Sequence, residues 1–89
     1  MGVNASSIAE AVGHAKKDLG EKVGIPSDQI KVVESAEAVW PDASLGMPEP
    51  GKMYAQMLTE GFRILLKAGD SEYEYHFGGG NMKMRPKMR

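Results

Sequence analysis

The sequence contains no cysteine, and this absence removes three classes of protein at once. A disulfide scaffold, a zinc site built on thiolates and a cysteine nucleophile all need that side chain. The two histidines, His14 and His76, do not stand with Asp or Glu at a recognised metal-ligand spacing. We therefore expect no metal site and no cofactor.

Long apolar runs are also missing. No run approaches the roughly 18 residues that a membrane span needs, and the N-terminus lacks the basic and apolar stretches of a secretory signal. We therefore expect a soluble, cytoplasmic protein. With 89 residues the chain has the length of one small domain, and we assign residues 1–81 to it.

The net charge is only −1, but the charges are unevenly distributed. The first 82 residues hold seven basic and twelve acidic side chains, and the last seven positions hold four cations. Four cations without interleaved aromatic residues would bind nucleic acid weakly, so we do not expect that partner. We expect residues 82–89 to form a short edge strand or a flexible tail. The cations are Lys83, Arg85, Lys87 and Arg89.

The N-terminal region has the spacing of a helix over residues 7–23. Ser7 and Glu10 match a capping box, and Gly24 followed by Pro26 is a typical helix end. Apolar side chains recur every three or four residues, which places them on one stripe. These are Ile8, Ala11, Val12, Ala15, Leu19 and Val23.

The remainder of the sequence predicts strands. Val33 and Val39 fall on the parity opposite to the other apolar residues, which predicts cover on both faces or a bulge. Gly61 suggests a turn at 59–62, and Gly69-Asp70 suggests a tight hairpin. Prolines shape a loop at 41–52. The predicted fold is α+β, with one helix packed on an antiparallel sheet of three to five strands. The expected strands are 30–40, 53–58, 62–68 and 72–77.

The segment from Trp40 to Phe77 resembles a small, uncharacterised bacterial and archaeal domain family. Its pattern is W-P-D-x-S-L-G-C-P-x-P-G, then Y-x-Q, G-Y-R-I and Y-x-Y-H, and most positions match here. Met47 stands where the family usually has cysteine, so the disulfide that the resemblance implies for some members cannot form. This substitution fits a reducing compartment. The order of elements is also distantly similar to PepSY and cystatin-like architectures, many of which bind or inhibit proteases.

Polar and aromatic residues around the loop and the strands form the candidate binding surface. Trp40 can anchor a ligand or fill the core, and Asp42 with Ser44 can bind a ligand or cap its own turn. Arg63 can hold a carboxylate or pair with Glu72 or Glu74. The candidates are Trp40, Asp42, Ser44, Tyr54, Gln56, Arg63, Tyr75 and His76.

The favoured function is a non-catalytic protein- or peptide-binding module that uses the 40–52 loop and the adjacent sheet face. One alternative is a protease inhibitor that presents residues 41–50. Another is a small enzyme that uses His76 with Asp42 or a tyrosine. His76 has no nucleophile or orienting carboxylate at an obvious offset, so we expect no catalytic residue.

Overall fold

The N-terminal helix forms where the apolar stripe predicted it. The computed structural model describes residues 7–87, and helix α1 spans Ile8–Val23. The Ser7 side chain accepts a hydrogen bond from the backbone N–H of Glu10, which satisfies one free donor of the first turn. Gly24 ends the helix in the left-handed conformation, at φ 71°, and its N–H donates to the Gly20 carbonyl.

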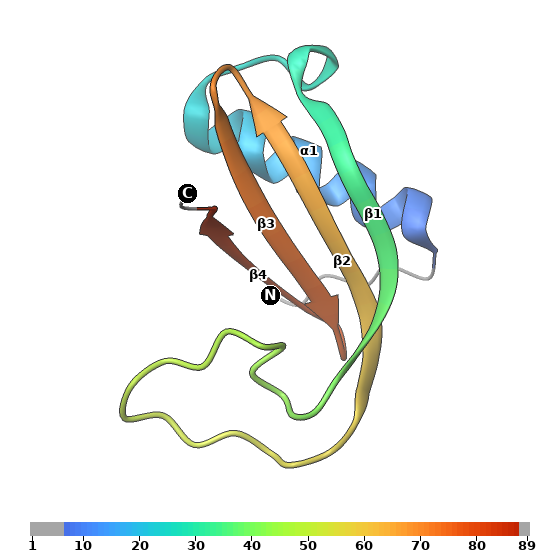
Figure 1. Ribbon diagram of the computed structural model, residues 1–89, viewed down its shortest axis with the longest axis vertical. Coiled ribbons are helices and arrows are strands. Elements are labelled where there is room, and N and C mark those ends of the chain that lie inside the picture. The colour runs from blue at the N-terminus through green and yellow to red at the C-terminus, as the bar shows by residue number, and fades with distance from the viewer. Residues whose placement is uncertain (1–6, 88–89) are drawn as a thin grey trace.

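Four antiparallel strands follow the helix and pair in sequence order, so that the sheet is a simple meander. The helix lies across one face of this sheet, as Figure 1 shows. The α+β fold with three to five strands is therefore confirmed. A short 3₁₀ turn at Ser27–Gln29 joins helix and sheet. The strands are β1 (Lys31–Trp40), β2 (Thr59–Ala68), β3 (Ser71–Gly78) and β4 (Asn81–Pro86).

The core lies between the helix and the sheet. The helix contributes mainly small residues to it, Ala11 and Ala15 beside Leu19, so its backbone can approach the strands closely. The strands supply the larger buried side chains, and Tyr75 at its far end donates a 2.7 Å hydrogen bond to Asp18 on the helix. Apolar burial on this one face is the main source of stability. The strand residues are Ile64, Leu66, Ala68, Tyr75 and Phe77.

The predicted strand at 53–58 is wrong. This segment is irregular, and Met53 is 98% exposed, so its alternating apolar residues have no partner strand to cover them. The loop between β1 and β2 therefore runs over residues 41–58, drawn green to yellow beyond the end of the sheet in Figure 1. The predicted turn at 59–62 is wrong as well. Gly61 lies inside β2, opposite Ala38 and Gly78.

Other local predictions are confirmed. The register of β1 shifts between Val32 and Glu34, so Val33 occupies a bulge, which explains the two parities of apolar residues in this strand. Gly69 has a positive φ of 61° in the β2–β3 hairpin. Residues 81–86 form the expected edge strand, whereas residues 1–6 and 88–89 lie outside the described part of the chain.

Gly61→Ala should be strongly destabilising. A Cβ at this position would lie 1.7 Å from the Phe77 carbonyl oxygen, so β2 and β3 would have to separate locally. We expect a loss of about 3 kcal/mol or more in the free energy of unfolding, measured by urea titration. The control is Gly13→Ala on the exposed side of α1, where a Cβ meets nothing within 4 Å. It should stabilise the protein by up to about 1 kcal/mol. Equal effects would contradict this account.

Candidate functional site

The sheet face opposite the helix carries a polar network. Cross-strand partners share a face of a sheet, so the register Arg63–His76–Lys83 places these side chains together, away from the apolar core. The same rule places Glu74 and Arg85 on this face. We call it the open face.

His76 is the centre of the open face and is only 3% exposed. Its Nδ1 lies 2.5 Å from the Leu45 carbonyl oxygen, and its Nε2 contacts the Glu74 carboxylate. A carbonyl oxygen can only accept a hydrogen bond, so Nδ1 donates to Leu45. The two contacts together hold the ring between the loop and β3.

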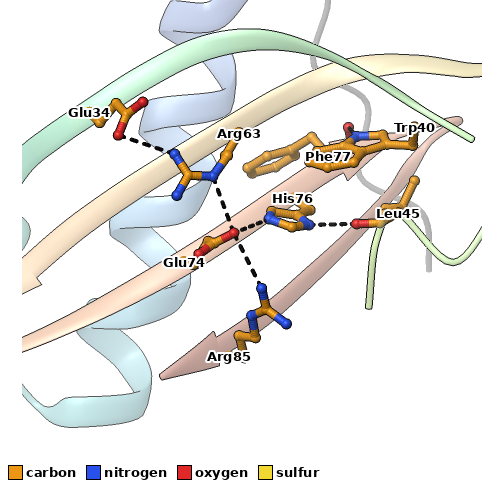
Figure 2. A network of polar contacts seen from close by, with 8 residues as sticks. All are labelled: Glu34, Trp40, Leu45, Arg63, Glu74, His76, Phe77 and Arg85. Atoms are coloured by element: carbon orange, nitrogen blue, oxygen red, sulfur yellow. Dashed lines mark hydrogen bonds and ion pairs between the residues drawn. The ribbon is translucent and has the colours of Figure 1, made fainter. Parts of the chain in front are cut away.

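Glu74 collects donors from three strands, as Figure 2 shows. Arg63 Nε lies 3.2 Å from its Oε2, and Arg85 Nη2 lies 3.7 Å from the same atom. Burial raises the pKa of Glu74, but hydrogen bonds from His76 and Arg63 outweigh it, so the pKa falls below its ordinary value of 4.5. Arg63 also pairs with Glu34 on β1, at 3.1 Å. The network therefore crosses all four strands.

Trp40 packs on the open face, outside the core between helix and sheet. Its ring stacks on His76, with centroids 4.1 Å apart, and its Nε1 donates a 2.9 Å hydrogen bond to the Phe77 carbonyl. The side chain is nonetheless only partly buried. Trp40 therefore packs over the histidine and leaves part of its ring at the surface.

The first part of the loop is held by its own side chains. Asp42 Oδ1 accepts hydrogen bonds from the hydroxyl and backbone N–H of Ser44, at 2.5 and 2.9 Å, and these bonds lower the pKa of Asp42. Leu45 is 1% exposed and has a positive φ of 57°, a conformation that is uncommon for a leucine. This turn aims the Leu45 carbonyl at His76.

Lys83 of β4 holds the middle of the loop. Its Nζ donates to the Met47 carbonyl at 3.1 Å and to the Tyr54 hydroxyl at 3.2 Å, and it lies 4.5 Å from the centre of the Tyr54 ring. The same hydroxyl accepts from the backbone N–H of Glu49. One lysine thereby joins two separate parts of the loop to the sheet.

The structure brings most of the sequence candidates together. Gln56 lies exposed in the loop instead of on a strand. Tyr75 faces the helix, where burial and its bond to Asp18 raise its pKa, so it is not part of the open face. The expected pairing of Arg63 with Glu74 is confirmed. The candidates on or beside the open face are Trp40, Asp42, Ser44, Tyr54, Arg63 and His76.

Sequence reasoning missed the carboxylate that orients His76. Glu74 stands two residues before His76, and in a strand this spacing places both side chains on one face. The expectation that no orienting carboxylate occurs at a defined offset is therefore wrong. The roles of Leu45 and Lys83 have no local signal, because each depends on how the loop folds back.

The chain belongs to the family described as a domain of unknown function, DUF8738, whose profile matches residues 12–85. Neither the comparison with curated proteins nor that with solved structures finds a significant match. Among residues 7–87, no helix is both long and apolar enough to cross a membrane, and no group of side chains is arranged to hold a metal ion. The likeness to PepSY and cystatin-like architectures stays a prediction.

Acid should weaken the network through Glu74. Its pKa is lowered in the folded state, so the unfolded chain binds more protons in the acid range, and stability falls as the pH falls through the folded pKa. Urea midpoints measured from about pH 5 to about pH 2 should decline less steeply in Glu74→Gln than in the wild type. An identical slope in both proteins would contradict this role.

Replacement of His76 should release the loop. His76→Leu leaves the buried Leu45 carbonyl without its partner and removes one of the contacts of the Glu74 carboxylate, which we expect to cost about 1–3 kcal/mol. Because Trp40 stacks on this ring and is the only tryptophan, its emission should shift to longer wavelength. The control His14→Leu lies on the exposed side of α1 and should change stability by less than about 0.5 kcal/mol. Unchanged emission in His76→Leu would refute the anchoring role.

Proposed function

We propose that this domain is a non-catalytic protein- or peptide-binding module that uses the 40–52 loop and the adjacent open face. The observation that carries the proposal is a long loop whose first part is held against the sheet and whose second part, up to β2, carries exposed apolar side chains. Met53, Met57 and Leu58 are 98%, 62% and 76% exposed. Exposed large apolar side chains of this kind on a small domain are typical of an interaction surface, and methionines adapt to a partner's shape.

The base of the loop adds a cavity to this surface. A cavity of about 430 Å³ lies between the loop and the β3–β4 turn, within the range of ligand-sized clefts. The exposed Leu58 and Met57 form part of its wall beside the buried Leu45. An apolar side chain of a partner can enter this cavity while the rest of the partner covers the exposed loop.

The state of His76 supports a non-catalytic role. A general base needs a free lone pair within reach of the substrate, and here both ring nitrogens of the buried His76 are occupied by contacts with Leu45 and Glu74. The inhibitor alternative has weaker support. Ser44 and Leu45, in the middle of the 41–50 segment, are 2% and 1% exposed and point into the protein. The cytoplasmic location expected from the sequence stays a prediction.

The test is a selection of binding peptides and a loop variant that should not bind them. Peptides from a random library are selected on the immobilised protein, and the affinity of the enriched peptides is measured by fluorescence anisotropy. Met57→Ser combined with Leu58→Ser should reduce that affinity at least about tenfold, because the exposed apolar contacts are lost. Both side chains are exposed, so the fold should be retained.

A matched surface variant controls for non-specific adsorption. Lys17 is exposed on α1, across the sheet from the open face. The Lys17→Ser protein should therefore bind the selected peptides as the wild type does. Equal affinities for the wild type and the loop variant would refute the proposal, as would a failure of the library to yield any specific binder.

A further inference from the structure

The outer edge of β4 carries backbone groups that no other strand among the described residues pairs with. Within residues 7–87, β4 has β3 as its only neighbour in the sheet. The backbone N–H of Lys87 donates to the Glu72 carbonyl, so Lys87 and Glu72 form a hydrogen-bonded pair of the β3–β4 ladder. These pairs alternate in an antiparallel ladder, so Met82 and Met84 direct their N–H and C=O groups away from β3. Pro86 also has an outward position, where its missing N–H breaks no ladder bond.

A groove accompanies this edge. A cavity of about 460 Å³ lies between β4 and the Met47–Glu49 part of the loop. The two faces of β4 differ in chemistry. Met82 and Met84 lie on the helix side and pack partly against the core, whereas Lys83 and Arg85 lie on the open face. An added strand would therefore meet apolar contacts on one side and cations on the other.

We propose that this groove binds an extended peptide of alternating acidic and apolar residues, which adds to β4 as a fifth strand. The inference rests on the proposed function and names its ligand class. Backbone bonds to Met82 and Met84 supply affinity, and the alternation of side chains supplies specificity. The acidic side chains face the exposed Arg85 and Lys87, and the apolar side chains face the methionines.

The charges along the edge select against other strands. Edge cations normally prevent two sheets from joining, and here they repel the β4 edge of a second copy. A peptide that carries carboxylates overcomes this barrier. Arg85 is best placed to bind a carboxylate, because its side chain is 55% exposed. Its contact with Glu74 is also loose, since the distance is 3.7 Å against 3.2 Å for Arg63. Lys87 is exposed beside it, and Glu49 at the groove is paired with Lys52 at 2.6 Å.

The opposite edge of the sheet would not take the same peptide. Strand β1 carries Glu34 and Glu37, which repel an acidic segment, and its bulge at Val33 interrupts a regular ladder. The chemistry of the two edges therefore assigns the acidic peptide to β4.

The test compares two peptides of identical composition with a third of opposite charge. Glu-Val-Glu-Val-Glu-Val is the probe, Glu-Glu-Glu-Val-Val-Val is the control without alternation, and Lys-Val-Lys-Val-Lys-Val reverses the charge. Anisotropy of dye-labelled peptides should show binding of the first alone, weakened by salt. Amide shifts in NMR spectra should be largest at Met82 and Met84. N-methylation of the probe at one set of alternate positions should abolish binding, and methylation at the other set should not.

Two variants locate the interaction on the protein. Met84→Pro removes one outward N–H without removing a β3–β4 ladder bond, and it should abolish binding, whereas Met84→Ala keeps the N–H and should bind measurably. Arg85→Gln should weaken binding by about fivefold at low salt. Retained binding in Met84→Pro, or largest amide shifts along β1, would overturn the inference.

The outcome is separable from that of the proposed function. Suppose that Met57→Ser with Leu58→Ser abolishes binding of the library peptides, while the acidic probe does not bind the wild-type protein. Only this inference then fails. If the acidic probe binds as expected while no library peptide depends on the loop, only the loop proposal fails. A mass that rises with protein concentration in analytical ultracentrifugation would indicate a second copy as the occupant, and this too would overturn the inference.

Discussion

The arrangement of the open face depends on one buried imidazole ring shared by two acceptors. His76 contacts the Leu45 carbonyl of the loop on one side and the Glu74 carboxylate of its own strand on the other. A buried donor or acceptor without a partner costs free energy. Movement of the loop away from the sheet would break the His76–Leu45 contact and would therefore be unfavourable. Within residues 7–87, every buried side-chain nitrogen and oxygen atom has a partner. The position of an irregular loop is thus determined by hydrogen-bond satisfaction.

The two faces of the sheet divide stability and positioning between them. The helix face buries apolar side chains around Tyr75 and Phe77, which stabilises the domain without specifying where the loop lies. The open face specifies where the loop lies but adds little stability. Its charged groups contribute little net free energy of folding, yet their contacts form in only one geometry. A small chain commonly fixes a long loop with a disulfide. This chain has no cysteine, and Lys83 instead binds the loop through the Met47 carbonyl.

Elements with local signals were predictable from the sequence, and elements that depend on distant contacts were not. The helix follows from its own spacing and caps, and the hairpin from Gly69-Asp70, since these conformations are encoded within a few residues. Gly61 is needed because a carbonyl of another strand lies close to it, and the sequence does not show this contact. From the sequence alone, the glycine is therefore interpreted as a turn signal. At the site, Glu74 and His76 share a face by simple alternation and could have been paired. No alternation of residues predicts that the loop turns back and places the Leu45 carbonyl against His76.

The basic C-terminal region shows how position in the fold decides what a charge does. As a sequence it resembles a cationic tail, yet β4 makes each cation face a different neighbour. Lys83 is used inside the domain, where it binds the loop and Tyr54. Arg85 lies at the end of the Glu74 network, and that carboxylate already receives closer donors from Arg63 and His76. Its guanidinium therefore keeps most of its capacity to donate hydrogen bonds. Because no strand in the described part of the chain pairs with the outer backbone groups of β4, charge and hydrogen-bonding capacity coincide along one edge.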